Sequence, residues 1–206
     1  GMAEVFGTER IRNTPLCESA VIGAALGLAL EGIPSIVELQ FSDFISSGFN
    51  QVVNNLATTY YRWGQSVPVV IRMPTGAGVN AGPFHSQSTE AWFHRVPGLK
   101  IVYPSNPVDA KGLLLAAIDD PNPILFYEHK ALYRSHKQPV PDEAYVVPIG
   151  KAAVVHPGDA LTLVTYGAMV HTCTHLIEKS AFDVEVIDLR TLKPIDYTTI
   201  YASLQK

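Results

Sequence analysis

Short, almost continuously apolar runs rich in β-branched residues alternate along this chain with longer helical patterns. The apolar runs are Ile11–Thr14, Ser35–Leu39, Pro68–Arg72, Leu99–Tyr103 and Ile124–Glu128. The helical patterns are Glu18–Leu30, Asn50–Trp63, Thr89–His94 and Pro107–Ile118. Strands without polar alternation are typical of a sheet covered on both faces, and helices between strands make the crossover connections of parallel strands. The sequence therefore predicts an α/β fold built on a parallel sheet with helices on both faces.

A stretch rich in Lys, Gln, Asp and Pro interrupts this alternation at residues 132–148. We interpret it as a linker between a first domain, residues 1–131, and a second α/β segment, residues 149–206. In the second segment we expect two strands and two helices, at Leu161–Thr165, Val184–Leu189, Met169–Lys179 and from Asp196 onward. About 60 residues are few for an independent sheet domain, so we expect the chain to be a fragment or one half of a split assembly.

Composition excludes several classes of protein. Hydrophobic residues make up 47% of the 206 residues and charged residues 17%, which excludes wholesale disorder. The net charge of −4 argues against a nucleic-acid partner, and no apolar run approaches the roughly 18–20 residues of a membrane span. The chain has only two cysteines, Cys17 and Cys173, and no basic leader followed by an apolar segment. These features predict a cytoplasmic protein, or one of the mitochondrial matrix if its source is eukaryotic.

Polar and aromatic residues follow three of the predicted strands. Glu18 comes after the first, Gln40 and Phe44 after the second, and His85 at the end of the Gly-rich loop after the third. Because ligands bind beyond the carboxyl ends of the strands in open parallel sheets, we expect these side chains to share one edge. Each has a structural alternative: a first-turn acid favoured by the helix dipole for Glu18, and a core position for Phe44 and the nearby Phe41. The loop position of His85 favours a functional role.

Two other patterns point away from chemistry. His171 and His175 are four residues apart on a predicted helix, but no third ligand and no His-Glu-x-x-His arrangement accompanies them. We interpret them as part of a solvated helix face, and we predict no metal ligands in this chain. A nucleophilic Cys17 would need an adjacent base such as His, but its neighbours offer only Glu18, so we interpret it as a small buried apolar residue.

Six stretches together resemble the beta subunits of thiamine-diphosphate-dependent 2-oxo acid dehydrogenases, the decarboxylating components of the pyruvate and branched-chain complexes. In chain order they are Asn13-Thr-Pro-Leu-Cys-Glu18, Leu39-Gln-Phe-Ser-Asp-Phe-Ile45, Phe84-His-Ser-Gln-Ser88, Pro97-Gly-Leu-Lys-Ile-Val102, Asp109-Ala-Lys-Gly-Leu-Leu114 and Val186-Ile-Asp-Leu-Arg-Thr-Leu192. They cover nearly the whole chain. The first two stretches are more similar to the branched-chain, or 2-oxoisovalerate, subgroup than to the pyruvate subgroup.

The resemblance implies a transketolase-like pyrimidine-binding domain followed by the start of a transketolase C-terminal-type domain. It also implies roles for five residues. Glu18 hydrogen-bonds the aminopyrimidine ring of thiamine diphosphate and promotes its activation, while Phe44 stacks on that ring and Leu16 and Gln40 line its pocket. His85 acts during transfer of the acyl group to lipoamide.

The resemblance further implies partners, because the family binds the diphosphate through Mg²⁺ held by a Gly-Asp-Gly motif of the alpha subunit. This chain has only Gly158-Asp159-Ala160, so the Mg²⁺ site belongs to an alpha subunit or to a fused alpha region. We expect a heterotetramer, or a homodimer of a fusion, that uses a 2-oxo acid and a lipoyl acyltransferase component. Relatives also hold a monovalent cation through backbone carbonyls, here near Val69, Ala117, Asp120 and Asn122.

Three alternatives remain at this stage. The chain belongs to a pyruvate-specific dehydrogenase, to another thiamine enzyme of the transketolase group such as a ketol transferase, or to an assembly module without chemistry. The presence of Glu18, Phe44 and His85 together argues against the last, since a degenerate copy has no reason to keep all three.

Overall fold

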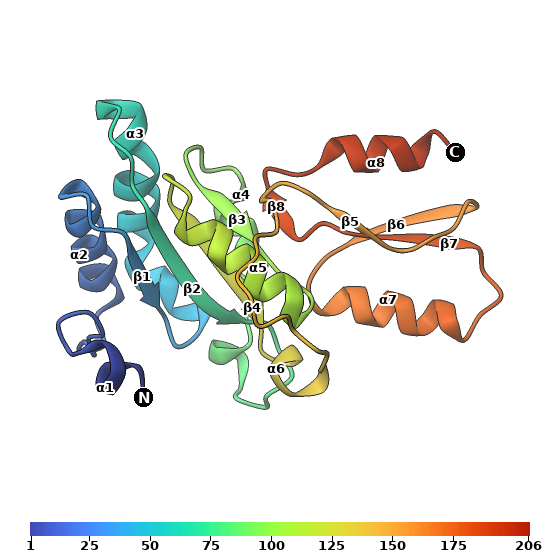
Figure 1. The fold of residues 1–206 in the computed structure, drawn as a ribbon, viewed down its shortest axis with the longest axis horizontal. Coiled ribbons are helices and arrows are strands. Elements are labelled where there is room, and N and C mark those ends of the chain that lie inside the picture. The colour runs from blue at the N-terminus through green and yellow to red at the C-terminus, as the bar shows by residue number, and fades with distance from the viewer.

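A five-stranded sheet in the order β1-β2-β4-β3-β8 is the centre of the larger of two units (Figure 1). The computed structural model describes residues 1–206. Strands β1 to β4 are parallel, as predicted, whereas β8 pairs antiparallel with β3, so the sheet is mixed. The strands are β1 (Ser35–Glu38), β2 (Val69–Thr75), β3 (Lys100–Val102), β4 (Ile124–His129) and β8 (Thr191–Lys193).

Helices cover both faces of this sheet, and each face has its own core. A cluster of 21 buried residues forms on the face covered by α2, the η segments and α4. A cluster of six forms under α5, where Leu113 and Ala117 pack on Val70, Ile124 and Phe126. The covering elements are α2 (Glu18–Leu30), the 3₁₀ helix η1 (Ser42–Gly48), the π-helical η2 (Gln51–Leu56), α3 (Ala57–Trp63), α4 (Glu90–His94) and α5 (Pro107–Ile118).

Helix α5 begins where the sequence predicts. The side chain of Asn106 accepts a hydrogen bond from the backbone N–H of Asp109 at 2.9 Å, and Pro107 occupies the first turn. This is the usual N-terminal capping arrangement, in which a side-chain oxygen satisfies a free backbone donor. Three shorter helices complete the first unit and the following segment: α1 (Met2–Phe6), η3 (Pro83–His85) and α6 (Leu132–Ser135). No helix combines the length and the apolar character that crossing a membrane requires.

The second unit extends from one edge of the first (Figure 1). Its three-stranded sheet has the order β5-β7-β6, with β7 parallel to β6 and antiparallel to β5. Helix α7 packs on β7 and β6 through a small core in which Ile177, Val184 and Val186 are buried. The elements are β5 (Ala153–His156), β6 (Leu161–Thr165), α7 (Ala168–Glu178), β7 (Val184–Asp188) and α8 (Tyr197–Leu204).

The predicted strand at Ile11–Thr14 is wrong, because the structure contains no strand in this segment. Arg12 instead folds back on Glu9, with Nη2 at 2.9 Å from Oε2 and Nε donating to the backbone oxygen at 3.0 Å. No strand of either sheet pairs with the segment. Strands β5 and β8 were not predicted from the sequence.

The segment between the units packs closely against α5. The Tyr145 hydroxyl donates to the backbone oxygen of Val108 at 2.8 Å, and the Val147 N–H donates to that of Gly112 at 3.1 Å. A Cβ at Gly112 would lie 2.6 Å from Val147 Cγ2 and 2.8 Å from the Tyr145 ring, so only glycine permits this approach. The connection is therefore tied to the first unit along its course.

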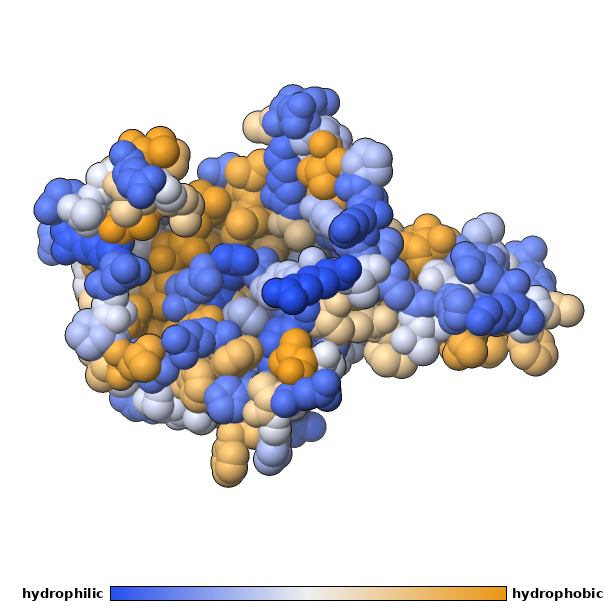
Figure 2. Space-filling model, turned by 90° about the horizontal axis from the view of Figure 1, so that it is seen from below, coloured by the Kyte–Doolittle hydropathy of each residue, from blue (hydrophilic) through white to orange (hydrophobic).

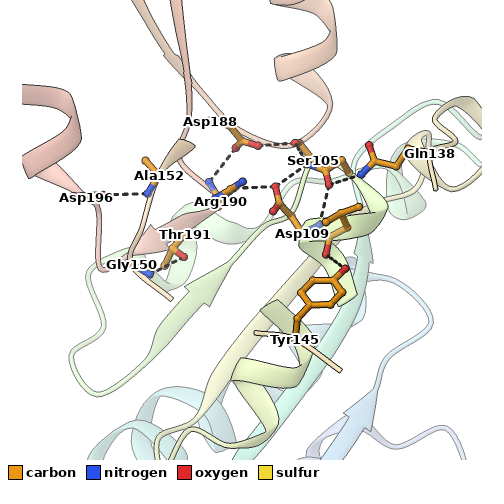
Figure 3. Close-up of polar contacts among 12 residues, drawn as sticks. Ser105, Asp109, Gln138, Tyr145, Gly150, Ala152, Asp188, Arg190, Thr191 and Asp196 are labelled. Atoms are coloured by element: carbon orange, nitrogen blue, oxygen red, sulfur yellow. Dashed lines mark hydrogen bonds and ion pairs between the residues drawn. The ribbon is translucent and has the colours of Figure 1, made fainter. Parts of the chain in front are cut away.

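A polar network joins the two units beyond this segment (Figure 3). Ser105 Oγ donates to Asp188 Oδ2 at 2.5 Å, and Arg190 Nε donates to Asp109 Oδ2 at 2.8 Å. Burial raises the pKa of Asp188, and the hydrogen bond from Ser105 opposes that shift. His171 Nε2 lies 2.7 Å from the backbone oxygen of Ser105. The interpretation of His171 as part of a solvated face is therefore wrong, since its ring contacts the joint between the units.

Gly98→Ala is expected to lower the free energy of unfolding by about 2 kcal/mol, because it combines a backbone strain with a clash. Gly98 has a φ of +84°, and a Cβ there would lie 1.9 Å from the backbone oxygen of Ala57. Urea denaturation measures the change. Gly27→Ala in α2 is the control, since its Cβ would meet nothing within 4 Å and alanine favours a helix. Equal stability of the two variants would contradict the expectation.

Candidate active site

Glu18 is the first residue of α2 and points to η1, the segment that carries Phe44. Its Oε2 lies 2.8 Å from Ser47 Oγ, and the same hydroxyl lies 2.9 Å from the backbone oxygen of Phe44. The two elements can approach closely because Gly48 has no Cβ. A Cβ there would lie only 2.6 Å from the Ile22 side chain. The glycine therefore brings the carboxylate and Phe44 together, and Glu18 is half-buried.

Three aromatic rings meet beside this pair. The ring of His85 stands edge-on to Phe41 with centroids 5.1 Å apart, and edge-on to Phe44 with centroids 5.5 Å apart. The centroids of Phe41 and Phe44 lie 6.0 Å apart. Edge-to-face contacts of this kind are favourable because the ring edge is positive and the ring face negative. The structure thus brings Phe44 and His85 together, as the carboxyl-end argument predicts. Glu18 is linked to the same segment through Ser47, although no strand precedes it.

The loop that carries His85 is fixed by groups on neighbouring strand ends. The N–H of Gln87 donates to Asp43 Oδ1 at 3.0 Å, and its backbone oxygen accepts from the Gly76 N–H at 3.0 Å. The ammonium of Lys130, the residue after β4, donates to the backbone oxygen of His85. That ammonium also lies 4.3 Å from the centroid of the Phe41 ring. Burial lowers the pKa of Lys130, and the Asp43 carboxylate opposes that shift.

A cavity of about 560 Å³ lies at the same edge of the sheet, between residues that follow β1, β2 and β4. Its lining includes Gln40, Phe41, Val79, Lys130 and Arg134. Viewed from this side, the first unit presents apolar side chains among polar ones, and the second unit projects to one side (Figure 2). Gln40 therefore lies in the same region as Phe41 and Lys130, which line the cavity with it.

Two residues of the N-terminal motif face outward in this chain. Leu16 is 79% exposed, so its predicted place in the cofactor pocket depends on groups outside this chain and stays a prediction. Cys17 is exposed as well, which makes its interpretation as a small buried residue wrong. Nowhere does the chain gather three or more His, Cys, Asp or Glu side chains that could hold a metal ion.

Sequence reasoning missed Ser47 and Lys130, and for Phe41 it offered only a core position as the alternative to a cofactor platform. Lys130 lies just beyond the predicted strand Ile124–Glu128, and this position after a parallel strand is the signal that indicates it. Ser47 has no signal of this kind, because its contact with Glu18 depends on how η1 packs against α2.

The family model described as "Transketolase, pyrimidine binding domain" matches residues 1–136. The chain belongs to this family. A second family model, "Transketolase, C-terminal domain", matches residues 150–206 of the same chain. The predicted fold class is thereby confirmed, with the correction that both sheets are mixed.

Curated relatives of this transketolase-type chain include beta subunits of two dehydrogenases. It is 47% identical to "2-oxoisovalerate dehydrogenase subunit beta" of Bacillus subtilis and 46% identical to "Pyruvate dehydrogenase E1 component subunit beta" of Acholeplasma laidlawii. Each match covers 100% of this chain and 64% of the relative, so the chain spans less than two thirds of their length. The resemblance predicted from the six stretches is confirmed.

A solved structure shares the fold of this transketolase-type chain. It is described as "Split gene transketolase, inactive beta4 tetramer", with a TM-score of 0.79 over 99% of this chain and 64% of that chain. At 23% identity the match supports the architecture alone.

Proposed function

We propose that this chain is the pyrimidine-side half of a thiamine-diphosphate-dependent 2-oxo acid dehydrogenase. The reaction is oxidative decarboxylation of a branched-chain 2-oxo acid with acyl transfer to lipoamide. The observation that carries the proposal is the meeting of Glu18, Phe44 and His85 at the carboxyl edge of the sheet. Relatives 42–47% identical to the chain are dehydrogenase beta subunits, which supports the reaction class. We place the domain limits at residues 1–131 and 149–206, with β8 of the second domain pairing with β3 of the first.

The residues present fit the pyrimidine end of thiamine diphosphate. One oxygen of Glu18 is held by Ser47, whose hydroxyl also contacts the backbone oxygen of Phe44. A carboxylate suits a weakly basic ring nitrogen with which it shares a proton, and a phenyl ring suits the face of a heterocycle. When bound, thiamine diphosphate supplies the nucleophilic carbon and the electron sink of the decarboxylation.

The residues present do not fit the diphosphate end and its Mg²⁺. The Gly158-Asp159 pair lies in the second unit, where the Asp159 N–H donates to Asp183 Oδ1 at 3.0 Å. We therefore assign the Mg²⁺ site to an alpha subunit or a fused alpha region. A heterotetramer, or a homodimer of a fusion, then completes the site and works with a lipoyl acyltransferase component in the cytoplasm or the mitochondrial matrix.

This chain's own residues divide the work in the proposed reaction. Glu18 holds the proton that it shares with the aminopyrimidine ring, and Ser47 fixes the orientation of the carboxylate. Phe44 would pack against the ring when the cofactor is bound and would shield it from water. His85 would hold or move a proton during transfer of the acyl group.

A pyruvate dehydrogenase is the second candidate function, because a pyruvate-type relative is 46% identical against 47% for a 2-oxoisovalerate-type relative. We favour the branched-chain reaction on the Thr14-Pro-Leu-Cys-Glu18 and Gln40-Phe-Ser-Asp-Phe44 stretches. The substrate side chain is the only difference between the two proposals.

The test combines the full-length beta subunit with its alpha subunit and measures the binding of thiamine diphosphate by calorimetry. We expect thiamine diphosphate with Mg²⁺ to bind the assembled protein and not this chain alone. The assembled protein should decarboxylate 2-oxoisovalerate faster than pyruvate. Faster turnover of pyruvate would select the second candidate, and ketol transfer between sugars without decarboxylation would overturn both.

A further inference from the structure

We propose that Lys130 is a positioning residue that holds the His85 loop against the aromatic side chains of the candidate active site. The inference rests on the proposed function and deepens it, because it gives His85 a partner from another strand. The proposal concerns placement of the imidazole, and Lys130 itself needs no contact with a substrate.

The position of Lys130 lets one ammonium group touch both sides of the site. Lys130 directly follows β4 and is 6% exposed. Its Nζ donates to the backbone oxygen of His85 and lies 4.3 Å from the Phe41 ring centroid. Phe41 is in turn the closer of the two phenyl rings that meet the His85 imidazole edge-on. The ammonium therefore fixes the backbone of His85 and the ring that the imidazole contacts.

The loop that precedes His85 has few other attachments. Gly76, Gly78 and Gly82 all have a positive φ, a conformation that glycine adopts freely, and residues 77–84 are exposed. The hydrogen bond from Ser86 Oγ to the Gly82 oxygen, at 2.7 Å, stays within the loop. Anchors to the rest of the protein lie at Gln87, which contacts Asp43 and Gly76. Lys130 is the anchor at His85 itself.

A lysine suits this place for a physical reason. A buried cation is stabilised by an aromatic face, by a carbonyl acceptor and by a nearby carboxylate, and the structure offers all three. Asp43 is 4% exposed and supplies the carboxylate. Methionine at this position would keep the length and apolar character of the stem but would remove the donor and the charge.

The first experiment measures placement without reference to activity. Hydrogen exchange followed by mass spectrometry compares the wild type, Lys130→Met and the control Lys137→Met, an exposed lysine seven residues further along the chain. We expect peptides spanning residues 82–87 to exchange faster in Lys130→Met only. Unchanged exchange there, or equal acceleration in both variants, would overturn the proposal.

The second experiment asks whether Lys130 acts through His85. In the enzyme assembled from full-length beta and alpha subunits, Lys130→Met should lower kcat about 10- to 100-fold, the effect expected of a misplaced catalytic group, while KM for 2-oxoisovalerate changes little. Lys130→Arg, which keeps the donor and the charge, should recover part of the loss. In a His85→Ala background, Lys130→Met should have no further effect.

The outcomes separate this inference from the proposed function. An equal loss in the wild-type and His85→Ala backgrounds would show that Lys130 acts by a general structural effect and would overturn the inference. A wild-type assembly that binds no thiamine diphosphate and decarboxylates no 2-oxo acid would overturn the proposed function. The exchange experiment would still decide whether Lys130 holds the loop.

Discussion

Glu18→Gln is expected to lower the rate of 2-oxo acid decarboxylation by about two to four orders of magnitude, the usual contribution of a positioned acid–base group. Glutamine keeps the size of the side chain and can still accept the hydrogen bond from Ser47. Its amide cannot take up or release the proton that a carboxylate shares with a ring nitrogen. The measurement is the initial rate of the assembled enzyme, saturated with thiamine diphosphate and Mg²⁺, with an artificial electron acceptor.

Two controls separate lost chemistry from lost structure in this variant. Glu31→Gln removes an exposed carboxylate just beyond the other end of α2 and should leave the rate unchanged. Calorimetry should show that Glu18→Gln still binds thiamine diphosphate when the alpha subunit is present. A Glu18→Gln enzyme that decarboxylates 2-oxoisovalerate as fast as the wild type would contradict the assignment of Glu18.

The central strands could be predicted from the sequence because their own residues determine their environment. In β2 and β4 most side chains are buried and the rest are half-buried, so the apolar run itself indicates the strand. Strand β8 has only three residues, and Thr191 and Lys193 flank a single Leu192. It is a strand because it pairs with β3, which is distant in the sequence. Such a pairing produces no periodic pattern in the residues of β8 itself. The same dependence on a neighbour explains why Ile11–Thr14, with a similar pattern but no partner, is not a strand.

Site residues that directly follow parallel strands could be predicted from the sequence. Site residues that tertiary packing brings into place could not. Gln40, Phe44 and His85 follow strands, and parallel strands bring their carboxyl ends to one edge. Glu18 reaches the same place by another route, through the packing of α2 on η1, because the strand expected before it does not exist.

The wrong interpretations of two residues outside the site, His171 and Cys17, have a common cause. His171 lies at the joint between the units, and Cys17 is exposed. Burial of a single residue depends on which other elements cover it, and local composition carries no information about that. Both errors therefore concern contacts with distant segments, which His171 makes and Cys17 lacks.

Arg190→Met is expected to lower the free energy of unfolding by about 3 kcal/mol, the low end of the range for removing one partner of a buried ion pair. Arg190 pairs with Asp109 (Figure 3). The Asp109 side chain is 4% exposed and that of Arg190 23% exposed, so the pair is largely shielded from water. Without the guanidinium, Asp109 keeps the hydrogen bond from Asn106 Nδ2 at 2.7 Å, which is why we expect the low end. Arg190 has a φ of 56°, and methionine has the same backbone strain, so that contribution cancels.

A double-mutant cycle shows whether the lower free energy of unfolding comes from the Asp109 carboxylate that has lost its ion-pair partner. Asp109→Asn removes the charge but keeps the shape, so in that background Arg190→Met should cost clearly less than in the wild type. Arg95→Met, at an exposed arginine just after α4, is the control for loss of a positive charge and should change stability little. An Arg190→Met variant as stable as Arg95→Met in urea denaturation would show that the ion pair does not hold the units together. Equal costs in the wild-type and Asp109→Asn backgrounds would place the role of Arg190 in its packing and not in its charge.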